Sequence, residues 1–167
     1  MKQRFLFVYL LVIAITYSCT SIKVISNKAD NSNQKLSNVF VLIQSEAKAT
    51  KFTNKLSNKL MTAFKNSKID GRYASKNSLS LETDQEFLNK IKSYNPNQLM
   101  IIKQTGISYR TPTIIESIRF KISILEYTSN TVIWKGELEV YGQVGLESSI
   151  NKSLNKLIQQ LKKDSLI

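Results

Sequence analysis

Hydrophobic residues recur along the chain with two different periods, which predicts alternating strands and helices. Residues 39–43 (VFVLI) and 99–102 (LMII) are continuous apolar runs, typical of strands that are buried on both faces. Between residues 47 and 67 the apolar side chains return at every fourth position, as one stripe of an amphipathic helix: Phe52, Leu56, Leu60 and Phe64. Residues 68–72 end this helix and start a short second strand.

A second helix is predicted after residue 83. Thr83 and Glu86 have the spacing of a capping box, and apolar residues follow them at helical spacing. Pro96 ends this helix, because proline cannot continue the hydrogen-bond ladder. The strand that begins at residue 99 extends towards Tyr109 and is broken at Thr111–Pro112.

Alternation of apolar and mostly polar residues predicts two long strands joined by a tight hairpin at Ser129–Asn130. One face of each strand is expected to be buried and the other largely wet. Gly142 to Gly145 form a turn, and the last helix follows with its own apolar stripe: Leu146, Ile150, Leu154, Leu157, Ile158 and Leu161.

The predicted order of elements is therefore β-α-β-α-β-β-β-α, without an internal repeat. Right-handed crossovers in the first two βαβ steps place the helices against one sheet. We expect an α/β (α+β) fold, a single layered domain in which a mixed sheet of about five strands is flanked by three helices.

The first residues have the layout of a secretory signal. Lys2 and Arg4 precede an uncharged, mostly apolar run over residues 5–17, and the small Ser18 precedes Cys19. The run is shorter than the roughly 17–25 residues that a membrane-spanning helix needs. Cys19 is the only cysteine of the 167-residue chain, so the exported domain cannot form an internal disulfide.

Ser18–Cys19 resembles the end of a bacterial lipobox, the motif that precedes the lipid-accepting cysteine of lipoproteins. The bulky Tyr17 stands where that motif usually has a small residue. Lipidation of Cys19 is the favoured interpretation, since the single cysteine lies at the expected cleavage point; plain secretion and an uncleaved anchor are the alternatives. The expected organisation is a signal peptide (1–18), a lipidated N-terminus with a flexible polar tether (19–36) and a globular domain (37–167). Ile22, Val24 and Ile25 interrupt the tether's polarity, which leaves a short edge strand as an alternative there.

Candidate catalytic residues are scarce. The chain has no histidine, the commonest general base, and its one cysteine is assigned to lipid attachment. A Ser-x-x-Lys pair at Ser45 and Lys48 is one of four such matches, as expected by chance in a chain rich in both residues. Glu137 and Glu139 share a strand face and are interpreted as solvated partners of Arg119 or Lys121 across the hairpin. No catalytic residue, metal site or cofactor is predicted.

The net charge is +12, from 24 Lys+Arg against 12 Asp+Glu. Lys48, Lys51, Lys55 and Lys59 lie at helical spacing beside the apolar stripe of the first helix. Such a lysine ridge is usually a solvated helix face, and its functional alternative is attraction to an anionic partner: lipid headgroups, acidic cell-wall polymer or an acidic protein. Nucleic acid is not expected as a partner of an exported protein.

The layout of signal, Cys19, polar tether, early VFVLI strand and a late hairpin ending in residues 131–136 (TVIWKG) resembles a family of small bacterial envelope lipoproteins. Their domain is similar to the N-terminal domain of the translocation protein TolB and to the lipoprotein activators of penicillin-binding proteins. The resemblance rests on layout, and only the role of Cys19 transfers from it. It implies a protein that supports envelope assembly or stimulates peptidoglycan synthases without catalysing a reaction.

We therefore expect a non-catalytic lipoprotein of the cell envelope, facing the periplasm and anchored in the outer rather than the inner membrane. It would bind an envelope protein or a cell-wall polymer. An oligomerising secretion-assembly or ligand-binding lipoprotein is the first alternative, and an envelope hydrolase is the second.

Overall fold

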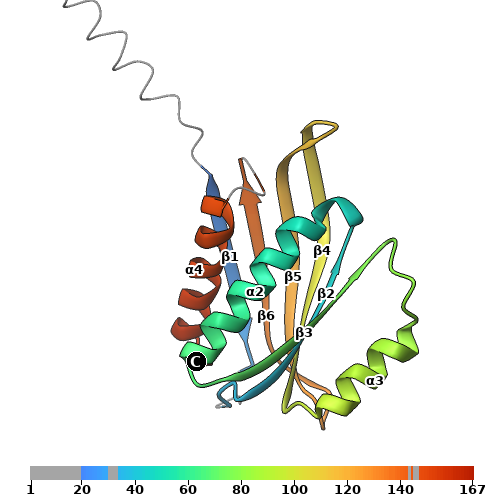
Figure 1. Ribbon diagram of the computed structural model, residues 1–167. Coiled ribbons are helices and arrows are strands. Elements are labelled where there is room, and N and C mark those ends of the chain that lie inside the picture. The colour runs from blue at the N-terminus through green and yellow to red at the C-terminus, as the bar shows by residue number, and fades with distance from the viewer. Residues whose placement is uncertain (1–19, 30–33, 143, 145–146) are drawn as a thin grey trace, which may run out of the picture.

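The computed structural model describes residues 20–29, 34–142, 144 and 147–167, which form a six-stranded mixed sheet with helices packed around it (Figure 1). The strands lie in the order β1-β6-β5-β4-β2-β3; β2 is parallel to β3 and β4, and the other neighbours are antiparallel. In chain order the elements are β1 (Ser21–Lys28), β2 (Asn38–Ser45), the 3-10 helix η1 (Ala47–Ala49), α2 (Thr50–Asn66), β3 (Asp70–Asn77), α3 (Asp84–Tyr94), β4 (Gln98–Thr111), β5 (Ile114–Glu126), β6 (Thr131–Tyr141) and α4 (Glu147–Lys163).

The predicted fold is confirmed, with one strand more than expected. From β2 onwards the elements follow the predicted order β-α-β-α-β-β-β-α, and three α-helices flank a mixed sheet. The sheet has six strands instead of about five, because β1 adds to it at the edge beside β6. The capping box is also present: the Thr83 side chain accepts from the backbone N–H of Glu86, and the Glu86 side chain accepts from that of Thr83.

Strand β1 replaces part of the predicted tether over residues 19–36 and is the edge strand that the sequence left open as an alternative. All eight residues of β1 pair with β6, and Ile22 and Val24 pack against the core from this strand. Leu36 is buried as well, and its N–H donates to the carbonyl oxygen of Leu166 over 2.8 Å. The strand is polar in composition because only one of its faces is covered. The globular domain therefore reaches back to Thr20, rather than starting at residue 37.

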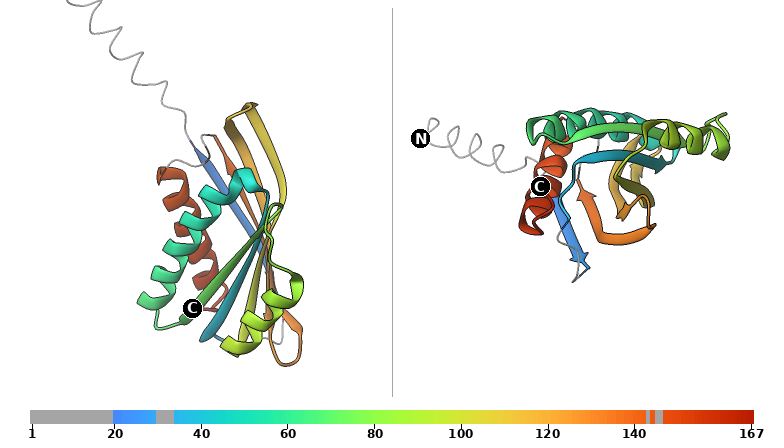
Figure 2. Two further views of the ribbon diagram at one scale, coloured as in Figure 1. Left: turned by 45° about the vertical axis from the view of Figure 1, so that its right-hand side comes forward. Right: turned by 90° about the horizontal axis from the view of Figure 1, so that it is seen from below.

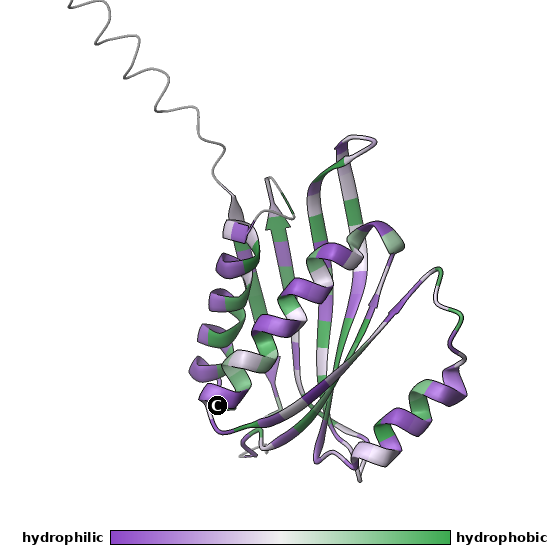
Figure 3. Cartoon of the chain, in the orientation of Figure 1, coloured by the Kyte–Doolittle hydropathy of each residue, from purple (hydrophilic) through white to green (hydrophobic). Residues whose placement is uncertain are grey.

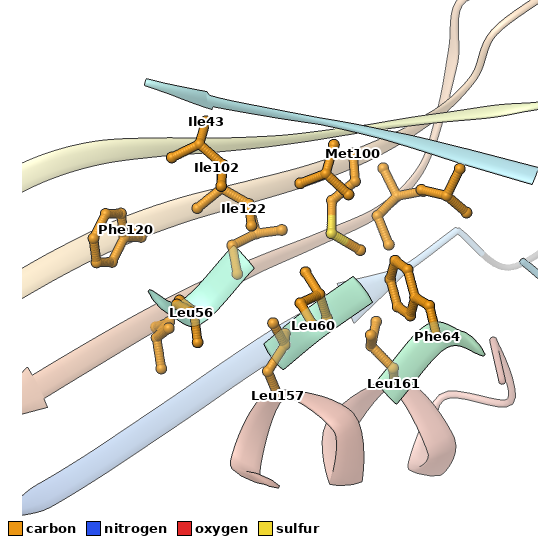
Figure 4. Close-up of a cluster of buried hydrophobic side chains, with 14 of the residues drawn as sticks. Ile43, Leu56, Leu60, Phe64, Met100, Ile102, Phe120, Ile122, Leu157 and Leu161 are labelled. Atoms are coloured by element: carbon orange, nitrogen blue, oxygen red, sulfur yellow. The ribbon is translucent and has the colours of Figure 1, made fainter. Parts of the chain in front are cut away.

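Helices α2 and α4 cover one face of the sheet and enclose the main core (Figure 2). Their apolar sides turn towards the strands and their polar sides turn outwards (Figure 3). The predicted stripe of α2 is buried throughout, and Leu157 and Leu161 of α4 pack beside its Leu60 and Phe64 (Figure 4). From the sheet, the alternating residues of β5 complete the core as predicted: Ile118, Phe120, Ile122 and Ile124.

Helix α3 lies on the opposite face, at the β2–β3 edge. Val39 and Val41 belong to the core under α2, so Phe40 between them must point to the other side of the sheet. There the Phe40 ring contacts that of Tyr94, with 5.8 Å between the ring centroids. None of the described helices covers the remainder of this face, over β4, β5, β6 and β1 (Figure 2). We call this surface the open face.

A polar cluster around Asp164 joins the two ends of the domain. The Asp164 carboxylate accepts from the Trp134 indole N–H and from the Ser26 hydroxyl, each over 2.7 Å, and also from the Gln160 amide. Burial alone would raise the pKa of Asp164, but the hydrogen bonds from Ser26, Trp134 and Gln160 outweigh it and hold the pKa below its ordinary value of 3.8. The cluster therefore ties β1 and β6 to α4.

Asp164→Asn is expected to destabilise the domain by roughly 1–2 kcal/mol at pH 7, because an amide replaces a charged acceptor shared by several donors. A carboxylate whose folded pKa is depressed contributes stability above its unfolded pKa and loses that contribution as pH falls through the folded pKa. The difference in Tm between wild type and variant should therefore be full at pH 7 and shrink below about pH 4. Thermal melts from pH 7 to pH 3 check this, and a constant difference would contradict it.

Within the part of the chain that the structure describes, none of the helices has both the length and the apolar character needed to cross a bilayer.

Candidate functional site

The predicted attachment point, Cys19, lies outside the described residues, but the chain next to it is well placed. Thr20, the following residue, is 8% exposed and leads directly into β1. The first residue of β1, Ser21, pairs with Tyr141 at the end of β6. A group carried by Cys19 would consequently be joined to the sheet edge through one buried residue, without a long intervening tether.

The predicted lysine ridge lies on the outer side of η1 and α2. Three of its four lysines interact with an acidic or aromatic side chain nearby. Lys55 and Lys59 both pair with Glu147 of α4, at 3.4 and 2.7 Å. Hydrogen bonds from these two ammonium groups lower the pKa of Glu147. Lys48 lies in η1 before the helix, with its Nζ 4.9 Å from the centroid of the Tyr109 ring. Lys51 makes no ion pair with any described residue.

A first hollow of about 400 Å³ opens where β2 and β3 end, beside the middle of β4. Ligands of α/β proteins often bind at this edge of the sheet, since the carboxyl ends of parallel strands meet there. Its lining residues are polar apart from one glycine, and the charged ones are two lysines, Lys76 and Lys103, and one glutamate, Glu46. Lys76 is paired with Asp84 and lies over the Phe87 ring.

The Ser45–Lys48 pair does not form the contact that a nucleophilic dyad needs. The Ser45 side chain lines the first hollow, and its Oγ is buried without a hydrogen-bond partner among the described residues. Lys48 is directed to Tyr109 and does not line the hollow. An activated serine requires a base within hydrogen-bond reach, so this pair gives no support to the hydrolase alternative.

Glu137 and Glu139 pair with Arg119 across β5 and β6, as the sequence indicated. The Arg119 Nε contacts Glu137 at 3.1 Å and makes a shorter contact with Glu139, which also accepts from the Tyr141 hydroxyl. Burial acts to raise the pKa of Glu139, but the hydrogen bonds from Arg119 and Tyr141 lower it overall. The ion pairs place both carboxylates against one guanidinium, across the β5–β6 hairpin. In the described parts of the chain, no three metal-ligating side chains gather into a group that could hold an ion.

Comparisons with known proteins identify the fold. No protein-family model matches the sequence, and no curated protein sequence matches it. Two crystal structures of PelC dodecamers from Paraburkholderia phytofirmans superpose on 83% of this chain at 12% identity. In the first, a point variant of PelC, the match covers 95% of the PelC chain with a TM-score of 0.56; in the second it covers 96% with a TM-score of 0.52. The lipoprotein GNA1162 from Neisseria meningitidis aligns with 76% of this chain and 99% of its own, at 12% identity and a TM-score of 0.47.

The chain shares the fold of PelC. At 12% identity this likeness concerns architecture, and no site residue is transferred through it. The resemblance to the TolB domain and to activators of penicillin-binding proteins stays a prediction from the sequence.

Proposed function

We propose that the protein is a lipid-anchored, non-catalytic module of the cell envelope that binds an envelope protein or a cell-wall polymer. The observation that carries the proposal is the position of the only cysteine, after a signal-like segment and one residue before the buried Thr20. A thiol there can accept a diacylglyceryl group, and the amine freed by cleavage can accept a further acyl chain such as palmitate. One acyl chain gives only marginal membrane binding, whereas two or more hold a protein firmly.

The proposed location is the periplasmic face of the envelope, in the outer membrane rather than the inner one. The short connection from Cys19 to β1 would hold the domain close to the lipid surface. A non-catalytic role is supported by the contacts described above: Lys48 lies over the Tyr109 ring and makes no contact with Ser45, and both glutamates pair with Arg119.

Replacing the cysteine tests the proposal directly. Cys19→Ser is expected to move the protein from the membrane fraction to the soluble periplasmic fraction, because the acyl-accepting thiol is lost. Ser18→Ala is the matched control, since alanine is also a small residue before the cysteine and should leave membrane attachment intact. Fractionation followed by immunoblotting measures both variants. Membrane attachment that persists in Cys19→Ser would contradict the lipid anchor.

An oligomerising secretion-assembly or ligand-binding lipoprotein is the second candidate. The loop between β3 and α3 exposes two large apolar side chains, Leu79 at 76% and Leu81 at 99%, and PelC, whose fold is similar, crystallised as a dodecamer. Light scattering on the purified protein distinguishes the candidates: a stable homo-oligomer without a foreign partner favours the second, and a monomer favours the first.

A further inference from the structure

Three lysines that pair with no described acid lie together on the open face of the sheet. Lys103 of β4, Lys121 of β5 and Lys135 of β6 alternate with the core residues of their strands, so they point away from α2 and α4. All three are exposed, and none makes an ion pair with another described residue. We call these three residues the basic band.

Two members of the basic band are direct cross-strand neighbours. Lys103 stands opposite Lys121 in the β4–β5 register. Like charges in this position repel, because directly opposite Cβ atoms lie only about 4.5–5.5 Å apart. The other cross-strand neighbour of Lys121 is Glu137, but the Glu137 carboxylate pairs with Arg119 instead. Lys103 and Lys121 therefore face each other without a close ion pair to a described acid, although Glu137 borders Lys121 on β6.

The surface around the basic band is hollowed on both sides of the lysine pair. Lys103 lines the first hollow, together with Gln44, its cross-strand neighbour on β2. Lys121 and Lys135 line a second hollow of about 470 Å³ over β5, β6 and β1. The row of residues beside the pair is less charged and half-buried: Leu42, Ile101 and Ser123. The open face thus combines cations without described acidic partners, amide and hydroxyl groups, and aliphatic side chains.

We propose that the basic band binds a linear acidic glycan, which lies across β4 and β5 between the two hollows. The ammonium groups of the band would receive carboxylates carried on successive sugars. Gln44 and Ser123 would exchange hydrogen bonds with sugar hydroxyls, and the C–H faces of the rings would rest on Ile101. The inference names the cell-wall polymer of the proposed function, so it depends on export of the domain to the envelope.

A glycan fits this surface better than a lipid membrane does. A membrane presents a broad plane of headgroups, whereas the lysines line two hollows. The sheet that carries them is also curved (Figure 2). The lysine ridge of α2 is the other surface that could contact a membrane. There, however, Glu147 already forms ion pairs with Lys55 and Lys59. The half-buried aliphatic side chains of Leu42 and Ile101 also offer nothing to a polyanion without sugar rings, such as polyphosphate.

Binding of the purified full chain to immobilised polygalacturonate, a linear glycan with one carboxylate per sugar, tests the proposal. The triple variant K103Q/K121Q/K135Q should bind roughly tenfold or more weakly, as expected for the loss of three charge contacts of modest strength. The variant K51Q/K55Q/K59Q removes the same charge from α2 and should change the affinity less than about threefold, because long-range attraction is screened by salt. Equal losses in both variants would show a nonspecific charge effect and overturn the proposal.

Comparison ligands distinguish the chemistry and are measured at the same salt concentration. Dextran, a neutral glycan, should not bind. Binding to polyphosphate or to phosphatidylglycerol vesicles without binding to polygalacturonate would overturn the assignment to an acidic glycan.

Lys103→Glu separates binding from folding. It places opposite charges across β4 and β5, so we expect the Tm to rise by about 1–3 °C while polygalacturonate binding falls. A variant that is at least as stable but binds more weakly supports the proposal. Unchanged glycan binding in this variant would contradict it.

Discussion

Replacing Gly136 with alanine is expected to lower the Tm by about 10 °C, which corresponds to roughly 3 kcal/mol of unfolding free energy in a domain of this size. The indole of Trp134, two residues earlier on the same face of β6, lies over Gly136. A Cβ at position 136 would meet the indole Cη2 at 2.3 Å and Cζ3 at 2.8 Å, which is far inside van der Waals contact. Trp134 is only 1% exposed and donates to Asp164, so the ring cannot move aside freely.

Gly106→Ala is the matched control for this clash, because its Cβ would have Arg119 Cβ as nearest neighbour at an ordinary 3.8 Å. Its Tm should remain within about 2 °C of wild type, as is usual for an unstrained substitution. A double-mutant cycle adds a second check: Trp134→Phe, which removes the clashing part of the ring, should cost less in the Gly136→Ala background than alone. Additive effects of the two substitutions would show that no steric conflict exists.

Removing residues 1–36 is expected to destabilise the domain by roughly 3–5 kcal/mol, a large part of the total stability of a domain of this size. The deletion removes Ile22 and Val24 from the core and the Ser26 hydroxyl from Asp164. It also exposes the edge of β6, and an unprotected edge strand promotes aggregation.

A chain that begins at Thr20 is the control for this deletion, because it retains all of β1 and the buried Leu36. We expect this chain to melt like the full protein, while the chain beginning at Ser37 melts much earlier or precipitates. Urea unfolding of the two truncated chains measures the difference. Equal stability would mean that residues 20–36 are a dispensable tether after all.

Local periodicity accounts for the parts of the fold that could be predicted from the sequence. The stripe of α2 and the alternation of β5 report burial on one face, and every predicted core residue of these two elements is buried. Strand β1 could not be predicted with the same ease, because only Ile22 and Val24 face the core while Ile25 is 53% exposed. Its partner β6 lies at the other end of the chain, so pairing across the sheet, rather than local pattern, determines this strand.

In the candidate site, too, local sequence patterns predicted some features, whereas others arise only from contacts between distant parts of the chain. The lysine ridge was visible because helical spacing is local, but the Glu147 that engages Lys55 and Lys59 comes from α4. The basic band was missed altogether. Lys103 and Lys121 become neighbours only through the β4–β5 register, and nothing in the sequence around either lysine distinguishes it from other exposed strand residues. The pairing of Arg119 with the two glutamates was predictable because a short hairpin fixes the register of β5 and β6.

Mass spectrometry of the mature N-terminus tests the central proposal most directly. The lipid anchor predicts that the chain purified from bacterial membranes begins at Cys19 and that this residue carries the mass of a diacylglyceryl group, with or without a further acyl chain. The Cys19→Ser variant should lack the modification. An unmodified Cys19 in the wild-type protein, or a chain that still carries residues 1–18, would contradict the account.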